Sequence, residues 1–160
     1  MTARTGAADH SRMHWHIETH GTEENKAALT ERLVEYNKQA SEAVRHRFEP
    51  GNLAATPIRR FAYDGSGTLV GGCTARTEDV WHWLTIDLLW VHADQRGTGL
   101  GHALLESVED EARSRGCRWA KVNTWDFQAP DFYARQGYVT YAEEPDYPPG
   151  HVNYLMRKDL

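Results

Sequence analysis

One segment constrains the fold of this chain more than any other, and it runs from Leu89 to His102. It begins at the end of Val80–Val91, a run rich in Trp, Leu and Ile that predicts a central strand buried on both faces. Three glycines follow within five residues, and apolar residues then recur at every fourth position, at Leu100, Leu104, Val108 and Ala112. This recurrence predicts one stripe of a helix, which Gly116 ends. The chain is therefore expected to pass from a strand through a glycine-rich turn into a helix.

The turn Arg96–Gly101 (Arg-Gly-Thr-Gly-Leu-Gly) has the features of an anion-binding site. Glycines let backbone N–H groups point into one cavity and let an anion approach closely. The helix N-terminus adds a partial positive charge and Arg96 a full one, and no acidic residue occurs from Thr98 to Leu105. A dinucleotide fingerprint is excluded because His102 replaces its third glycine, and a nucleotide P-loop because Gly-Lys-Ser/Thr is missing. A flexible turn without a ligand is the alternative to a phosphate site.

The first half of the chain predicts a strand, a helix and a hairpin. Short alternation predicts a first strand over Met13–Thr19. Thr22 is expected to cap a helix with two glutamates in its first turn, continued by apolar residues at helical spacing, namely Leu29, Leu33, Tyr36, Ala40 and Val44. After a loop at Pro50–Asn52, the runs Thr56–Tyr63 and Thr68–Arg76 flank Asp-Gly-Ser-Gly and predict an antiparallel hairpin.

The second half predicts three further strands and one short helix. The strands are expected over Arg118–Trp125, Tyr138–Ala142 and Val152–Lys158, and the helix over Gln128–Gln136. A loop rich in proline precedes the last strand. The element order β-α-β-β-β-α-β-α-β-β predicts an α/β fold with a mixed sheet and helices on both faces.

Composition restricts the kinds of partner. At 160 residues with 40% hydrophobic and 26% charged residues, the chain fits one soluble domain. The net charge of −5 argues against nucleic acid and leaves room for a cationic substrate. No apolar run is long enough to cross a membrane, and the first dozen residues are expected to be a flexible tail. The chain has two distant cysteines, Cys73 and Cys117, which are too few for a disulfide scaffold or a metal site. They are expected to be buried thiols in a reducing, cytoplasmic compartment.

Two motifs together carry a resemblance to a known family. Arg-x-x-Gly-x-Gly after a strand that ends at Val91, followed about 30 residues later by Ala129–Tyr138 (Ala-Pro-Asp-Phe-Tyr-Ala-Arg-Gln-Gly-Tyr), resembles the GNAT superfamily of N-acetyltransferases. The resemblance covers about Trp15 to Lys158 in element order. It implies a mixed, mostly antiparallel sheet with a splayed central strand pair, a single acetyltransferase domain over residues 13–160, and acetyl-CoA as the co-substrate.

The resemblance also implies which residues hold acetyl-CoA. Leu89, Trp90 and Val91 would offer backbone groups to the pantetheine arm, which lies between this strand and the next like an extra strand. The pyrophosphate would be held by Arg96 and by main-chain N–H groups of Gly97, Thr98, Gly99, Leu100, Gly101 and His102. Asp126 occupies a position where the family often has Asn; it can accept a hydrogen bond from the cofactor but has no amide N–H to donate.

Direct attack of an amine on a thioester needs a proton acceptor and help for the departing thiolate. Tyr133, at the position of the family's catalytic tyrosine, is the expected acid. Asp87, a carboxylate within an apolar strand, is the expected base, since a lone buried charge is costly unless it is paired or used. Alternation would place Asp87 on one face with Thr85, Leu89 and Val91. A paired structural role is the alternative for Asp87, and His82 and His151 are rival bases.

Two stretches are expected to shape the amine pocket. One is aromatic and contains Trp81 and Trp83, and the other is the late loop with Glu143, Glu144, Asp146 and Tyr147, because carboxylates and aromatic faces attract an ammonium group. The sequence thus predicts transfer of an acetyl group to a small cationic metabolite or antibiotic, with a homodimer as one possible assembly. Protein lysine or N-terminal acetylation and a non-catalytic acyl-CoA sensor are the alternatives.

Overall fold

The computed structural model describes residues 15–160 and divides the chain into two units, 1–40 and 41–160. The first unit contains α1 (Glu23–Ala40), which begins where predicted. The Thr22 hydroxyl accepts a hydrogen bond from the Asn25 N–H at 3.2 Å, and the Asn25 side chain accepts one from the Thr22 N–H at 2.9 Å. Each side chain thus satisfies the backbone N–H of the other residue, as in a capping box. None of the residues of α1 is buried. The expected tail, residues 1–12, lies outside the described residues.

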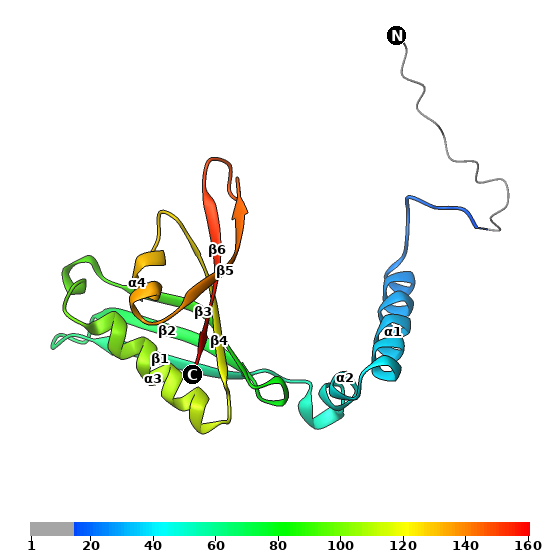
Figure 1. The fold of residues 1–160 in the computed structure, drawn as a ribbon, viewed down its shortest axis with the longest axis horizontal. Coiled ribbons are helices and arrows are strands. Elements are labelled where there is room, and N and C mark those ends of the chain that lie inside the picture. Colours follow the sequence, from blue (N-terminus) through cyan, green and yellow to red (C-terminus); the bar gives the residue numbers. More distant parts are fainter. Residues whose placement is uncertain (1–14) are drawn as a thin grey trace, which may run out of the picture. The chain divides into compact units, whose positions relative to one another are not determined.

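The second unit is built on one six-stranded sheet with the order β1-β2-β3-β4-β6-β5 (Figure 1). The strands are β1 (Thr56–Tyr63), β2 (Leu69–Glu78), β3 (Trp83–Val91), β4 (Trp119–Trp125), β5 (Val139–Pro145) and β6 (Val152–Asp159). Only β3 and β4 pair in parallel, and all other neighbours are antiparallel. The predicted hairpin and the mixed, mostly antiparallel sheet are confirmed.

Two helices lie on the same side of this sheet, α3 (Leu100–Ser114) and α4 (Pro130–Arg135) (Figure 1). The apolar stripe of α3 packs on β1, β2 and β3, with Leu104, Leu105, Val108 and Ala112 buried. The helix ends at the residues before Gly116, which has a φ of +84° that suits glycine. Cys73 and Cys117 are free and buried in this core, as predicted, and burial raises the pKa of the Cys73 thiol to about 12.

Three details differ from the sequence predictions. Of the predicted first strand, residues 15–19 pair with no strand of the described sheet, which begins at Thr56; alternation alone does not make a strand without a ladder partner. The predicted helix through Val44 is two helices, because Ser41 is extended and caps α2 (Glu42–Arg47) through its hydroxyl. Residues 79–81 form a 3₁₀ turn, so β3 is shorter than Val80–Val91.

β3 is also not buried on both faces along its whole length, because it carries a bulge. Thr74 pairs with Leu88 and Ala75 with Ile86, so Asp87 is an extra residue opposite β2. The bulge reverses the alternation: Leu84 and Ile86 before it and Leu89 and Val91 after it all pack toward the core. The predicted shared face of Thr85, Asp87, Leu89 and Val91 is therefore wrong, and Leu88 is 56% exposed.

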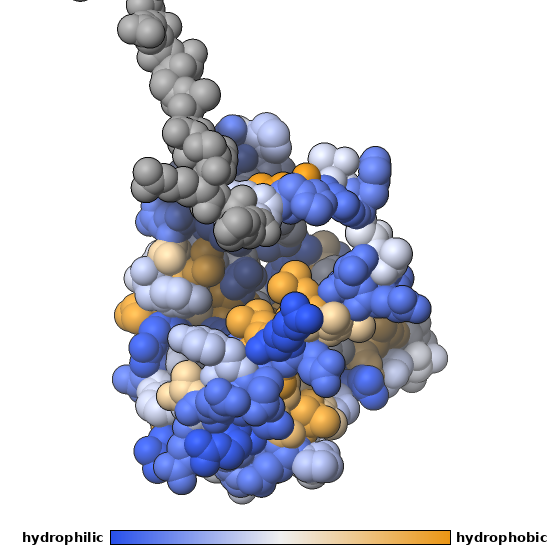
Figure 2. All heavy atoms as spheres, turned by 90° about the vertical axis from the view of Figure 1, so that its right-hand side faces the viewer, coloured by the Kyte–Doolittle hydropathy of each residue, from blue (hydrophilic) through white to orange (hydrophobic). Residues whose placement is uncertain are grey.

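On the face shown in Figure 2, hydrophobic patches lie among hydrophilic side chains. No helix in the described range combines the length and the apolar character that a membrane span needs.

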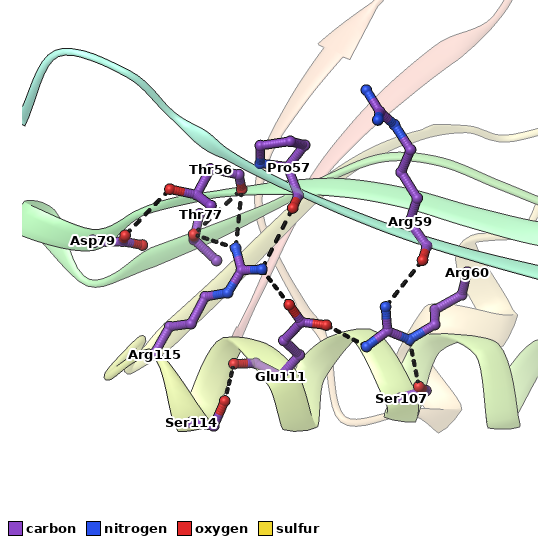
Figure 3. A network of polar contacts seen from close by, with 10 residues as sticks. All are labelled: Thr56, Pro57, Arg59, Arg60, Thr77, Asp79, Ser107, Glu111, Ser114 and Arg115. Atoms are coloured by element: carbon purple, nitrogen blue, oxygen red, sulfur yellow. Dashed lines mark hydrogen bonds and ion pairs between the residues drawn. The ribbon is translucent and has the colours of Figure 1, made fainter.

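A network of hydrogen bonds and ion pairs connects α3 to the edge strand β1 and its neighbour β2 (Figure 3). Glu111 accepts hydrogen bonds from the guanidinium groups of Arg60 on β1 and Arg115 at the end of α3. Arg60 also donates to Ser107 at 2.9 Å, and Arg115 donates to the Thr56 carbonyl and to the Thr77 hydroxyl, both at 3.3 Å. The Glu111 carboxylate thus holds two guanidinium groups, and their contacts join β1, β2 and α3.

Glu111→Gln should lower the free energy of unfolding by about 1 kcal/mol, because both guanidinium groups lose a charged acceptor in a partly exposed setting. Chemical denaturation measures the change. Glu106→Gln, on the exposed side of the same helix, is the matched control and should leave the free energy of unfolding within about 0.5 kcal/mol of wild type.

The same network predicts a pH dependence. Arg60, with Arg115, holds the pKa of Glu111 below its usual value. A lowered folded-state pKa stabilises the fold above the ordinary Glu pKa of about 4.3, and this stabilisation disappears as pH falls through the folded value. The difference between wild type and Glu111→Gln should be constant above about pH 5 and shrink in more acidic solution. A difference that persists unchanged in acid would contradict the role of the carboxylate charge.

Candidate active site

The 41–160 unit contains a cleft of about 1170 Å³ between β3 and β4. The two strands pair only at Trp83–Trp119, Leu84–Ala120 and Thr85–Lys121, and beyond these residues they separate. The cleft opens there, lined by residues 86–91 of β3, residues 122–125 of β4, the turn before α3, and α4. The predicted splayed strand pair is therefore present.

The glycine-rich turn forms one end of this cleft. Gly97 and Gly99 have φ values of +79° and +93°, and a Cβ atom at either residue would meet only open space. Gly99 is the N-cap of α3 and provides no side-chain acceptor, and the first turn of α3 contains no acidic residue. The first N–H groups of the helix are therefore available to an external anion. Arg96 lines the cleft and donates through Nε to the Val91 carbonyl at 3.2 Å.

Most of the residues predicted to hold acetyl-CoA lie together along the cleft. They are Leu89, Trp90, Val91, Arg96, Gly97, Gly99, Gly101, His102 and Asp126. Thr98 and Leu100 do not line it with their side chains, since the Thr98 hydroxyl bonds to the Gln95 carbonyl at 2.8 Å and Leu100 packs on the core. His102 contacts the Gln136 side chain at 2.6 Å and so ties the start of α3 to the end of α4.

Tyr133 lies on α4 and lines the cleft, although only 6% of its surface is exposed. Its ring is held edge-on by Phe132 and Tyr138, with centroids 5.2 and 5.5 Å away. Tyr138 in turn donates to the buried carboxylate of Glu109 at 2.9 Å. Among the described residues the Tyr133 hydroxyl has no hydrogen-bond partner. Burial raises its pKa above the ordinary value, so the hydroxyl stays protonated and can donate to a ligand.

Asp87 reaches the cleft from the bulge of β3, but its carboxylate is paired with the guanidinium of Arg76 on β2. The pair is partly exposed, with 37% of the Asp87 side chain accessible. Taking up a proton would break this ion pair, which favours the structural alternative for Asp87.

The two rival histidines lie in different places. His82 occupies the turn before β3, at the closed end of the strand pair, where its carbonyl accepts from the Arg118 N–H at 2.8 Å. It is not among the residues that line the cleft. His151 lies just before β6 and does not line the cleft itself, but its Nδ1 is 3.0 Å from Oδ1 of Asp126, which does line the cleft.

Of the residues expected to shape the amine pocket, only Tyr147 lines the cleft. Trp81 lies under the Arg47 guanidinium, and Trp83 packs against Trp119 and beneath two cations at the closed end of the strand pair. Glu144 accepts from the Asn153 side chain at 2.6 Å and Asp146 from the Gly150 N–H at 2.7 Å, whereas Glu143 is exposed.

Sequence reasoning missed Trp125, Phe127 and Asn153, which also line the cleft. The rings of Trp125 and Phe127 are stacked, 5.7 Å apart and 10° from parallel. The Trp125 Nε1 group is buried without a hydrogen-bond partner in the described structure, which is costly unless a ligand accepts its proton. Trp125 and Phe127 could have been predicted as cleft residues, because they lie at the end of the strand that was expected to separate from its neighbour.

Comparisons with known proteins agree with this geometry. The model of the acetyltransferase (GNAT) family matches residues 13–138. Blasticidin-S acetyltransferase from Streptomyces morookaense is 42% identical over 133 residues, which are 81% of this chain and 96% of that protein.

Solved structures give the same fold. The crystal structure of an acetyltransferase from Bacillus cereus ATCC 14579 is 28% identical, with a TM-score of 0.70 over 91% of this chain and 98% of that one. An aminoglycoside 6′-N-acetyltransferase complexed with coenzyme A shares the fold at 20% identity, with a TM-score of 0.58 over 74% of this chain and 78% of that one.

Gly99→Asp should weaken acetyl-CoA binding at least tenfold, about 1.4 kcal/mol, because it adds a negative charge at the uncapped helix N-terminus. Gly99→Asn is the matched control: asparagine tolerates positive φ and has the same shape without the charge. It should lose clearly less affinity. Calorimetric titration of both folded variants measures the difference, and wild-type affinity in Gly99→Asp would remove the pyrophosphate from this turn.

Proposed function

The chain belongs to the acetyltransferase (GNAT) family and is an acetyl-CoA-dependent N-acetyltransferase, and from this premise we propose that its acceptor is an amine on a small-molecule antibiotic. The match to blasticidin-S acetyltransferase is the observation that carries this proposal, because it spans nearly the whole of that protein. Blasticidin S is therefore the first acceptor to test.

The cleft residues have the chemistry that acetyl-CoA needs. The uncapped N–H groups at the start of α3 and the Arg96 guanidinium bind the pyrophosphate. The unpaired edge of β3 from Leu89 to Val91 offers backbone hydrogen bonds to the pantetheine arm, which has amide groups of its own. Holding the thioester and the amine in one cleft supplies much of the rate acceleration, since their encounter becomes effectively unimolecular.

Tyr133 assists the leaving group by donating a hydrogen bond. A free thiol has a pKa of about 8.5, and burial moves the pKa of Tyr133 away from that value. Complete proton transfer from this hydroxyl to the thiolate is therefore uphill. The hydroxyl instead stabilises the thiolate as its charge develops, in the way of a positioned dipole, and the thiolate takes its proton from solvent.

The acceptor is tested by thiol release from acetyl-CoA across a panel of antibiotics that includes blasticidin S, simple amines and peptides with a lysine or a free N-terminus. We expect release with at least one antibiotic, at a kcat/KM at least about tenfold above that of any peptide or simple amine. Preference for a peptide would replace the proposal with protein acetylation. Tight acetyl-CoA binding without release for any acceptor would indicate a sensor.

Tyr133→Phe should lower kcat by about 10²-fold while leaving the Kd of acetyl-CoA nearly unchanged, since the ring contacts with Phe132 and Tyr138 are retained. A donor with a more acidic leaving thiol should show a smaller defect, because its thiolate needs less stabilisation. Tyr141→Phe makes the same chemical change on the exposed surface of β5 and should have no effect. Equal defects with both donors would instead indicate that the hydroxyl only positions the substrate.

A further inference from the structure

His151 and Asp126 form a hydrogen-bonded pair at the rim of the cleft. Nδ1 of His151 lies 3.0 Å from Oδ1 of Asp126. An ionised carboxylate can only accept, so Nδ1 carries the proton of the neutral imidazole and Nε2 keeps its lone pair. Asp126 lines the cleft directly, and so does Phe127, whose ring meets the His151 ring edge-on with centroids 4.7 Å apart. His151 itself is not among the lining residues, but it contacts two residues that are, so its ring lies directly behind the wall of the cleft.

Backbone hydrogen bonds fix both members of this pair. The Asp126 N–H donates to the Val152 carbonyl at 2.9 Å, which joins the end of β4 to the residue after His151. Oδ1 of Asp126 also accepts from the Phe127 N–H at 2.8 Å. On the other side, the His151 N–H donates to the Pro148 carbonyl at 3.0 Å, and its carbonyl accepts from the Tyr147 N–H at 3.2 Å. The pair is thus preorganised without a ligand.

We infer that His151 is the general base of acetyl transfer and that Asp126 positions it, a conclusion that rests on the proposed function. The amine nitrogen attacks the acetyl carbonyl carbon, a C–N bond forms, and the C–S bond breaks with its electron pair on sulfur. The proton lost by nitrogen goes to Nε2 of His151, directly or through one water. The thiolate leaves against the Tyr133 hydroxyl and is protonated by solvent, and the imidazolium returns its proton to solvent.

The surroundings favour this role. Four carboxylates lie on the segments next to His151: Asp126 at the end of β4, Asp146 in its own turn, and Glu143 and Glu144 on β5. The cations of β4 and β6, which are Lys121, Arg157 and Lys158, lie toward the end where β3 and β4 pair. These carboxylates stabilise an imidazolium and attract a cationic amine. If Asp87 were the base instead, it would have to give up its ion pair with Arg76 when it takes the proton. The other rival, His82, lies at the closed end of the strand pair.

This assignment gives Asp126 a role different from the predicted contact with the cofactor. As the orienting carboxylate it holds the tautomer that leaves Nε2 free, which is what the Asp of a serine-hydrolase triad does for its histidine. Removing its charge should slow the reaction and leave acetyl-CoA binding intact. A cofactor ligand would show the reverse pattern.

The test is a pH–rate profile of His151→Gln in the full chain, from about pH 6 to pH 9, with whichever amine the wild type acetylates. We expect kcat near neutral pH to fall about 10²-fold or more, with an unchanged Kd for acetyl-CoA. The rate of the variant should keep rising with pH as free amine accumulates. Asp126→Asn should lose at least about tenfold in kcat, and free imidazole should partly restore His151→Gly.

The matched control is His46→Gln. His46 makes the same kind of contact, with Nδ1 2.9 Å from the Glu49 carboxylate, but it lies on α2, and Glu49, unlike Asp126, does not line the cleft. It should leave kcat and the pH profile unchanged. Asp87→Asn, run in parallel, tests the rival base: whatever its kcat, the pH dependence of its rate should keep the wild-type shape.

Two results would overturn the inference: a wild-type pH profile in His151→Gln, or a loss confined to acetyl-CoA affinity. If the wild type acetylates another amine but not blasticidin S, only the proposed acceptor is affected. The test of His151 can then be carried out with that other amine. A wild-type protein that binds acetyl-CoA and acetylates nothing overturns both.

Discussion

The separation of β3 from β4 is the constraint on which the rest of the site depends. Parallel pairing stops after Thr85 and Lys121, while β3 continues to Val91 beside β2 and β4 continues to Trp125 beside β6. Backbone groups on the facing edges are left without a strand partner, and such groups need hydrogen bonds from water or a ligand. An extended ligand with amide groups satisfies them as an added strand would. The fold thus creates a binding site by leaving its own sheet incomplete.

Several features of the cleft follow from this separation. The bulge at Asp87 lies where the strands part, and it turns Leu88 outward while Leu89 and Val91 stay packed on α3. The uncapped N-terminus of α3 lies at the cleft, since Gly99 and Gly101 both line it. α4 is held against α3 by the His102–Gln136 contact and brings Tyr133 to the same space. The proposed anion site and the proposed donor come from one face of the sheet, and the His151–Asp126 pair comes from the residues just after β4 and just before β6.

Local patterns predicted the elements that depend on local chemistry. The hairpin, the glycine turn, α3 and the motif around Tyr133 each have periodicity or turn residues that specify them, so the residues along the turn could be placed from sequence. The bulge could not, because alternation continues through Asp87 in the sequence and only the pairing with β2 shows the extra residue. The expected pocket residues Trp81 and Trp83 failed to reach the cleft for a related reason: the closed end of a splayed pair cannot be told from its open end by composition.

Long-range contacts were the least predictable. Asp126 and His151 are 25 positions apart, and their hydrogen bond depends on β6 lying beside β4, an order that sequence patterns do not encode. The Arg76–Asp87 pair likewise depends on the register of β2 and β3. The proposed choice among the candidate bases rests on these two contacts, and neither of them could be predicted from the sequence.

Hydrogen–deuterium exchange with and without acetyl-CoA tests the central claim most directly, since it reports which backbone amides the ligand covers. The account predicts slower exchange in two segments, Leu88–Val91 of β3 and Gly97–His102 of the turn, with no change in β1 (Thr56–Tyr63). Unchanged exchange in both segments under saturating acetyl-CoA would contradict it, and so would protection confined to other parts of the chain, because the cofactor would then lie outside the cleft between β3 and β4.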